Sequence, residues 1–260
     1  MISPADITAW SERAPWPLPD QVEQDLVLTR LMIEIANHEQ LRTELVMRGG
    51  TCLHKLWMPP ARYSEDLDYV RTNAGPVGPL LDALRAIAID VGFERFDTQI
   101  GRHPKARFRW TAASGNRLNI KVEMNTFERS PARSPTTRPA TMTSEWHTAT
   151  GDVTTFVIEE LVATKIRALY QRTKGRDLFD LWLAVNDLGV APAAIAACFG
   201  PYRPDGWSVD LARTNLAAKL ADERFVTDLH RLVAAWPSNY DVAAGAEVTE
   251  RVLDAIEAFT

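Results

Sequence analysis

The first half of the chain contains two segments in which apolar residues recur at helical spacing. Over residues 20–45 they fall every three or four positions, and the same spacing returns over residues 77–92. Because one helical turn takes 3.6 residues, each segment predicts an amphipathic helix with one buried face. Gly92 stands where a glycine typically ends a helix.

Shorter apolar segments between and after these helices are typical of strands. The sequence predicts strands at 45–48, 67–70, 93–100, 106–112 and 118–125. In the last of these, apolar and polar residues alternate from Leu118 to Asn125, so that one face meets a core and the other does not. The N-terminal part is therefore predicted to be a mixed α/β lobe covering residues 1–150.

The second half of the chain has a different pattern. Residues 130–149 are rich in Pro, Thr, Ser and Arg, which predicts a loop or a boundary between two lobes. From Phe156 onward the apolar spacing is helical, with segments near 157–170, 178–188, 208–235 and 241–259. We therefore expect an α+β protein with an all-helical lobe over residues 151–260.

Composition and charge exclude several classes of protein. The chain has 260 residues, 46% of them hydrophobic, which is enough for one large domain or two small ones. No apolar stretch reaches the roughly 18 residues of a membrane helix, and no signal-peptide pattern is present, so we expect a cytoplasmic protein. The net charge of −5 argues against a uniformly basic surface for nucleic acid but allows a local basic groove.

Candidate metal ligands lie at alternate positions of two predicted strands. Asp66 and Asp68 are separated by one residue, so both carboxylates point to the same side of their strand. Glu123 lies on the polar face of another strand. Mg²⁺ prefers hard oxygen ligands, and three such carboxylates suit a two-metal site for phosphoryl-type transfer. Alternatively, the two aspartates belong to a solvated turn, and Glu123 pairs with Lys121 or Arg117.

A glycine pair precedes the next predicted helix. Gly49 and Gly50 follow Arg48 at the end of a predicted strand, and Thr51 begins the helix. Glycines at such a junction let backbone N–H groups approach a phosphate, and a helix N-terminus favours the anion. The hydroxyl of Thr51 can add a further donor. The combination of this turn with the two aspartates about fifteen residues later indicates phosphoryl-type transfer far more specifically than either motif alone.

A second group of charges lies in the predicted helical lobe. Lys165 falls beside the apolar face of its helix, and Asp177 and Asp180 lie three positions apart on the next one. One hypothesis is that Lys165 neutralises a triphosphate while the aspartates orient it or contact the nucleotide sugar. The alternative is a solvated helix face, with Lys165 paired to a glutamate of its own helix. Arg176 is the expected structural partner of the aspartates.

Candidate residues for nucleic-acid contact gather around one predicted strand. Lys105, Arg107 and Arg109 alternate there, with aromatic residues on the opposite face. Beside a catalytic groove such a face can bind phosphates, whereas alone it is a solvated strand face. Further candidates are Arg102, His103, Arg129, Arg133 and Arg138.

Four segments together resemble the AbiEii/AbiGii family of nucleotidyltransferase toxins, which includes the MenT-like toxins. The segments are 23–26, 48–55, 62–68 and 159–181. In order, they resemble an acidic pair on the first helix, a (K/R)GGTxLxK turn, an RxSEDxD motif and a helical motif that contains a lysine. The likeness spans about residues 20–190 and does not extend to the last seventy residues.

The resemblance implies a polymerase β-type nucleotidyltransferase lobe with a mixed sheet, which the helical C-terminal lobe completes. It implies Mg²⁺ or Mn²⁺ as cofactor and an NTP as substrate. The predicted metal ligands are Asp66, Asp68 and Glu123. The predicted catalytic residues are these three with Lys165 and Asp177, and the predicted NTP-binding residues are Arg48, Gly49, Gly50, Thr51, Lys165 and Asp180.

The resemblance also implies a toxin of a toxin–antitoxin or phage-defence pair. Such an enzyme would move a nucleoside monophosphate from an NTP to RNA, at the 3′ end of tRNA, and thereby block translation. Its expected partners are the NTP, tRNA or another RNA, and a cognate antitoxin, an AbiEi-like winged-helix regulator, with no membrane. Two alternatives stay open: a nucleotidyltransferase that modifies a small molecule or protein, and a non-catalytic module that binds NTP or RNA.

Overall fold

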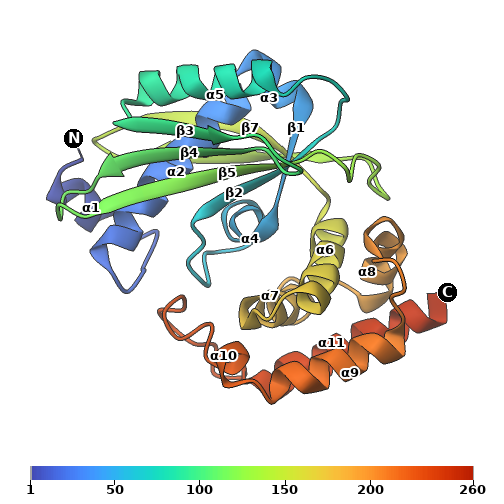
Figure 1. Cartoon of the computed structure of the whole chain (residues 1–260). Helices are drawn as coiled ribbons and strands as arrows, with labels where there is room; N and C mark the ends of the chain where they lie inside the picture. The colour runs from blue at the N-terminus through green and yellow to red at the C-terminus, as the bar shows by residue number, and fades with distance from the viewer. Residues whose placement is uncertain (1, 260) are drawn as a thin grey trace. The chain divides into compact units, whose positions relative to one another are not determined.

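A seven-stranded mixed sheet forms the centre of the first part of the chain in the computed structural model, which describes residues 2–259 (Figure 1). Its order is β3-β4-β5-β2-β1-β7-β6. The pairs β2–β5 and β1–β7 are parallel and the other pairs are antiparallel. This confirms the predicted mixed sheet and α+β class. The strands are β1 (Leu45–Arg48), β2 (Asp66–Arg71), β3 (Arg95–Gln99), β4 (Lys105–Thr111), β5 (Arg117–Asn125), β6 (Thr136–Thr143) and β7 (Thr148–Thr155).

Two long helices cover one face of this sheet. Helices α2 (Pro19–Asn37) and α5 (Gly78–Val91) contact each other as well as the strands, so they lie on the same side. Gly92 ends α5 with a φ of 89°, the left-handed backbone that the sequence predicts for a terminal glycine. The predicted helix over residues 20–45 is instead two helices, because His38 is extended between α2 and α3 (Glu39–Glu44).

The remaining helical segments of this part of the chain are short. Helix α1 (Pro4–Trp10) begins after Ser3, whose hydroxyl accepts the N–H of Asp6. Helix α4 (Gly49–Cys52) follows β1 directly and continues as a π-helical turn, η1 (Leu53–Trp57). Turns of this kind occur often at functional sites. This chain segment runs from the double glycine to the residues that precede β2.

The loop predicted over residues 130–149 is wrong for most of this range, because β6 and the beginning of β7 form a hairpin there. The other interpretation, a boundary between two parts of the chain, agrees with residues 130–134. Threonines occupy many positions of the hairpin, and β-branched residues fit a pleated surface well. Pro139, which lacks an N–H donor, is tolerated because β6 is an edge strand. The loop signal from Pro and Ser therefore outweighed a strand signal that was also present.

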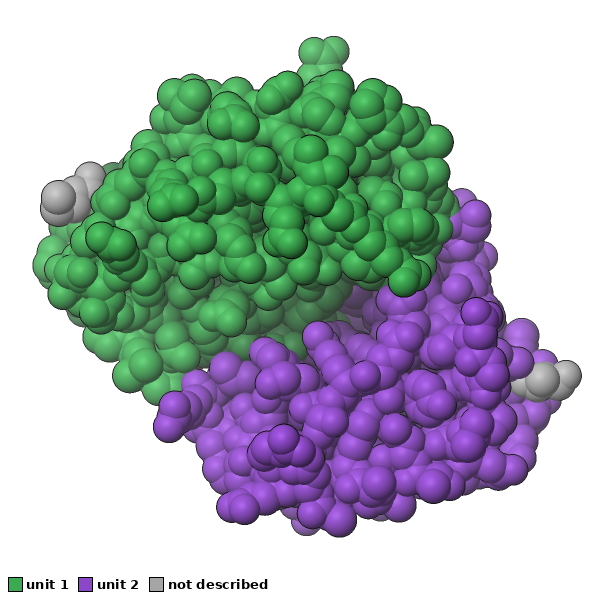
Figure 2. Space-filling model, viewed as in Figure 1, with its two compact units in different colours: residues 1–129, 135–155 green, residues 130–134, 156–260 purple. Residues whose placement is uncertain are grey.

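The chain divides into two compact units (Figure 2). Unit 1 contains Met1–Arg129 and Pro135–Thr155, and unit 2 contains Ser130–Ser134 and Phe156–Thr260. The boundary predicted after residue 150 falls within β7, which continues to Thr155. The five residues 130–134 belong to unit 2 although they precede the hairpin of unit 1.

Every described element of unit 2 is helical. The elements are α6 (Ile158–Gln171), α7 (Gly175–Asn186), α8 (Pro192–Phe199), η2 (Gly200–Tyr202), α9 (Val209–Leu220), α10 (Glu223–Val226) and α11 (Val242–Phe259). The single helix predicted over 208–235 is broken near Ala221, and α8 is an additional helix. Across the described residues of the whole chain, no helix has both the length and the apolar character needed to span a membrane.

Candidate functional site

The aspartates of the sequence motif lie on one side of a central strand. Asp66 and Asp68 are two residues apart on β2, and Leu67 between them is fully buried. The strand register places Asp68 opposite Arg48 on β1 and opposite Glu123 on β5. Three adjacent strands therefore place Arg48, Asp68 and Glu123 side by side, as the alternating pattern of β5 requires. We call these residues, together with Asp66, the carboxylate row.

The double-glycine turn lies against this row. Gly49 has a φ of +86°, and a Cβ atom at this position would lie 2.5 Å from Oδ2 of Asp68. A Cβ atom on Gly50 would overlap the guanidinium of Arg62. Both positions therefore require glycine for space, and Gly49 requires it for its backbone conformation as well. The turn and the Asp-x-Asp motif are direct neighbours.

Thr51 connects the turn to the start of β2. Its hydroxyl lies 2.6 Å from the main-chain oxygen of Asp66, to which it donates, and 2.9 Å from Oγ of Ser64. The sequence suggested this hydroxyl as a donor to phosphate. In the structure it fixes the distance between the helix start and the first aspartate.

Lysines neutralise the carboxylates of the row. Nζ of Lys121 lies 2.9 Å from Asp66 and 3.4 Å from Glu123, and Nζ of Lys105 lies 3.2 Å from Glu123. The alternative partner considered for Glu123 is thus present, together with Lys105, which was expected to face nucleic acid. Arg48 is bonded to Glu128 in the turn after β5. The site holds its charges in a compensated network.

The pKa values of these groups follow from this arrangement. Burial raises the pKa of Asp68, and repulsion from Asp66 raises it further, against the opposing effect of Arg48 and Lys121. For Glu123, burial favours a higher pKa, but Lys121 and Lys105 outweigh it and the pKa is lowered. The ionised form of Asp68 is therefore destabilised, and a cation bound beside it would stabilise that form.

The donor atoms at this site are of the chemical kind that a divalent cation prefers. Their present arrangement in the described part of the chain does not bring enough of them together to hold one. Asp66 and Asp68 supply the carboxylate oxygens that Mg²⁺ and Mn²⁺ prefer, on a rigid strand. Within residues 2–259, however, no three His, Cys, Asp or Glu side chains are gathered closely enough to hold a metal ion. Glu123 is held by its lysines and must leave them to become a third ligand.

Polar residues of α2 fasten the segments that carry the motifs. Asp25 is buried and accepts the Nζ–H of Lys55 at 2.5 Å and the indole N–H of Trp10 at 2.8 Å. The neighbouring Gln24 accepts the hydroxyl of Tyr63 at 2.6 Å. The ion pair between Asp25 and Lys55 was not predicted from the sequence. Its signal is a buried-face aspartate combined with a lysine four residues after Thr51.

The predicted charge cluster of unit 2 is fully buried. Nζ of Lys165 lies 2.7 Å from Asp180 and 3.5 Å from Asp177, and the side chains of both aspartates are 0% exposed. Arg172 makes two hydrogen bonds to Asp177, at 2.6 and 2.8 Å. The expected partner Arg176 pairs with Asp228 instead. A solvated helix face is thus the wrong interpretation.

The pKa of Asp177 reflects the same contacts. Burial favours a higher pKa, but Lys165 and Arg172 outweigh it, so the pKa of Asp177 is lowered. Glu160, on the helix that carries Lys165, accepts the backbone N–H groups of Ala132 and Arg133. The ammonium of Lys165 is therefore directed to the aspartates of α7.

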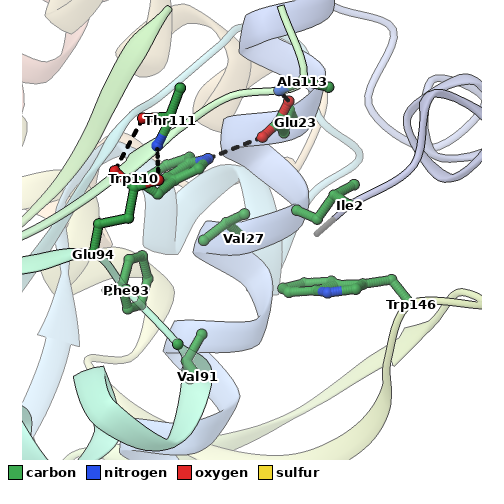
Figure 3. A pocket seen from close by; sticks show the side chains of 11 residues that line it. Ile2, Glu23, Val27, Val91, Phe93, Glu94, Trp110, Thr111, Ala113 and Trp146 are labelled. Carbon is green, nitrogen blue, oxygen red and sulfur yellow. Dashed lines mark hydrogen bonds between the residues drawn. The ribbon is translucent and has the colours of Figure 1, made fainter. Parts of the chain in front are cut away.

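A cavity of about 240 Å³ lies elsewhere in unit 1 (Figure 3). Glu23 accepts the indole N–H of Trp110 and the backbone N–H of Ala113, both at 2.9 Å, and Glu94 accepts two hydrogen bonds from Thr111. The carboxylates of the lining are thus used by the lining itself. None of the predicted site residues lines this cavity, so it is separate from the carboxylate row.

In unit 1, a glycine turn thus lies beside an Asp-x-Asp strand. The chain belongs to the AbiEii family: residues 30–244 match the family described as nucleotidyl transferase AbiEii toxin, type IV toxin–antitoxin system. None of the curated proteins searched matches the chain.

Solved structures share the fold. MenT4, a nucleotidyltransferase toxin from Mycobacterium tuberculosis, is 18% identical, with a TM-score of 0.57 over 98% of this chain and 90% of that one. JHP933 from Helicobacter pylori is 16% identical, with a TM-score of 0.53 over 92% of this chain and 93% of that one. At these identities the likeness establishes the α+β fold.

Proposed function

We propose that this toxin-family nucleotidyltransferase moves a nucleoside monophosphate from an NTP to RNA, at the 3′ end of tRNA, and so blocks translation. The observation that carries the proposal is the contact between Gly49 and Asp68. A phosphate-binding turn must lie beside the carboxylates for nucleotidyl transfer, and a Cβ atom at residue 49 would lie 2.5 Å from the carboxylate of Asp68. The AbiEii match supports the same activity.

In this proposal Asp66 and Asp68 are the residues that would hold Mg²⁺ or Mn²⁺, and Glu123 joins them after leaving Lys105 and Lys121. A divalent cation there would supply positive charge to the phosphates and activate the attacking hydroxyl. The backbone N–H groups of Gly49 and Gly50, at the start of α4, would bind phosphate oxygens. Arg48 and Thr51 hold the two strands that flank this turn, through Glu128 and the carbonyl of Asp66.

Lys165 is proposed to contribute charge to the triphosphate, with Asp177 and Asp180 as positioning residues. The support is the motif of residues 159–181 and the buried contacts of the lysine with both aspartates. The two aspartates fix the direction of the ammonium, which a substrate-binding lysine needs. Replacement of Lys165 by methionine is expected to raise the KM for NTP while the helical fold, measured by circular dichroism, is retained.

A cognate antitoxin is the proposed protein partner, because the family is defined by a type IV toxin–antitoxin system. We take it to be an AbiEi-like winged-helix regulator that prevents the toxin from blocking translation. The enzyme is proposed to act in the cytoplasm, where NTPs and tRNA are available. Co-expression of the adjacent reading frame should relieve growth arrest caused by this chain.

The activity is tested by incubating the purified protein with each labelled NTP and Mg²⁺, in the presence of total tRNA, total protein or neither. The proposal predicts label in tRNA that is removed by digestion from the 3′ end. Label in protein or in a small molecule would show that RNA is not the acceptor and that the enzyme modifies one of these other classes of molecule. Absence of NTP binding in calorimetry would indicate that the chain is a non-catalytic module.

A further inference from the structure

An aromatic side chain stands exposed in the turn that follows β5. Phe127 is 59% exposed, although the chain around it is well ordered by hydrogen bonds. Oδ1 of the buried Asn125 accepts the backbone N–H groups of Phe127 at 2.8 Å and of Glu128 at 3.0 Å. The ring is therefore presented by a fixed turn. A single exposed apolar residue is common on proteins and by itself indicates nothing.

An arginine and a histidine lie against this ring. The guanidinium carbon of Arg102 lies 5.1 Å from the ring centroid, and the imidazole of His103 meets the ring edge-on with centroids 5.8 Å apart. Within residues 2–259, Arg102 forms no ion pair with an acidic side chain, and Nδ1 of His103 lacks a hydrogen-bond partner. We call Arg102, His103 and Phe127 the aromatic–basic cluster.

Both chain segments of the cluster are bonded to the carboxylate row. Glu128, next to Phe127, binds Arg48, which lies opposite Asp68 in the strand register. Lys105, three residues after Arg102, binds Glu123. Because Arg48, Asp68 and Glu123 share one side of the sheet, the turn after β5 reaches across that side. The cluster is thus adjacent to the site where the transferred phosphate would be attacked.

We propose that the aromatic–basic cluster binds the unpaired terminal nucleotide of the acceptor RNA, with its base stacked on Phe127 and a backbone phosphate on Arg102. This inference rests on the proposed RNA-labelling function and adds the subsite that receives the acceptor. Every base has a π-face, so stacking on an exposed ring holds a single-stranded end without selecting its sequence. An arginine already lying over the ring can contact the phosphate or extend the stack.

Four variants test the subsite: Phe127→Ala, Phe127→Trp, Arg102→Ala and Phe259→Ala. Phe259, at the end of α11, is 65% exposed and serves as a matched control for loss of a surface phenylalanine. Loss of one stacked base is expected to raise the KM for RNA roughly tenfold in the first variant, with the KM for NTP unchanged. Phe127→Trp should restore the parent KM, and Phe259→Ala should equal the parent.

A binding measurement separates this inference from the proposed function. Fluorescence anisotropy of a labelled single-stranded RNA oligonucleotide, without NTP, should show about tenfold weaker binding to Phe127→Ala than to the parent. An equal affinity of the two proteins, or an increased KM for NTP in Phe127→Ala, would overturn the subsite. If the parent binds this RNA through Phe127 but labels no RNA with any NTP, the proposed function fails and the subsite stands.

Discussion

Oδ2 of Asp68 lies 2.5 Å from the point that a Cβ atom of residue 49 would occupy, and Gly49 has a φ of +86°. Two separate physical requirements therefore converge on one glycine. The backbone conformation favours glycine in any context, whereas the close approach requires it only because a carboxylate is adjacent. The second requirement ties the turn to the chemistry of the site.

Gly49→Ala is expected to reduce nucleotidyl transfer at least a hundredfold, because the new methyl group displaces the carboxylate of Asp68 and small misplacements of reacting groups cost this much. Gly115, in the turn between β4 and β5, is the matched control. It has the same φ of +86° with nothing within 4 Å of its Cβ position. Gly115→Ala should lose about 1–2 kcal/mol of stability from the strained backbone while its activity matches the parent. Equal activity losses in both variants would refute the contact argument.

In the proposed metal site, Lys121 would compete with a divalent cation for the same carboxylates. It lies 2.9 Å from Asp66 and 3.4 Å from Glu123, so its removal leaves the site more negative. Lys121→Met should bind Mn²⁺ roughly tenfold more tightly, as measured by electron paramagnetic resonance of the free ion. Lys174→Met, which removes a lysine paired with Asp228, should bind Mn²⁺ like the parent. Weaker Mn²⁺ binding by Lys121→Met would show that the lysine supports the metal site.

The ion pair between the buried Asp177 and the exposed Arg172 makes stability depend on pH in the acid range. The folded-state pKa of Asp177 is lowered, since Lys165 and Arg172 outweigh burial, so its contribution is complete above the unfolded pKa of about 3.9 and disappears as the pH falls through the folded value. Arg172→Gln should lower the free energy of unfolding by about 2 kcal/mol at pH 7. This difference should shrink below about pH 4.

Urea unfolding between pH 3 and pH 7 measures this dependence. Arg224→Gln is the control, because Arg224 also makes two side-chain bonds to an aspartate, Asp222, but at an exposed position. Exposed pairs contribute little, so this variant should unfold like the parent at every pH. A difference between parent and Arg172→Gln that stays constant down to pH 3 would contradict the assignment to Asp177.

Asp25 is predicted to be a major contributor to stability in unit 1. Asp25→Ala leaves the ammonium of Lys55 and the indole N–H groups of Trp10 and Trp16 without their acceptor. A loss of about 3 kcal/mol in the free energy of unfolding is expected in urea titrations. Asp6→Ala, at a partly exposed carboxylate that accepts hydrogen bonds from Ser3 and Trp146 but forms no ion pair within residues 2–259, should cost less. Similar losses in both variants would mean that Asp25 is not a central anchor.

The parts of the fold that rest on local periodicity were predictable from the sequence. The alternation from Leu118 to Asn125 became β5, and Gly92 ends α5 as a left-handed terminal residue. The hairpin of β6 and β7 was missed because its pairing partner, β1, is distant in the chain, and proline and serine give a strong loop signal. The local pattern of apolar and polar residues does not show which distant strand a segment pairs with.

In the candidate site, too, the features set by local spacing were predictable and those set by distant contacts were not. The spacing of Asp66 and Asp68 determines that they share a face of β2, whatever the rest of the fold. The contact of Gly49 with Asp68 depends on the antiparallel pairing of β1 and β2, which no sequence spacing specifies. The ion pair of Asp25 with Lys55 likewise joins residues that only the packing of α2 brings together.

We propose above all that the carboxylate of Asp68 is required for nucleotide transfer and not for folding. Its pKa is raised by burial and by Asp66, so its charge is a cost to the folded protein, and Asp68→Asn should unfold at the parent temperature or above. We predict that this variant, incubated with labelled NTPs, Mg²⁺ and tRNA, transfers no label above background. Labelling of tRNA by folded Asp68→Asn at the parent rate would contradict this role of Asp68.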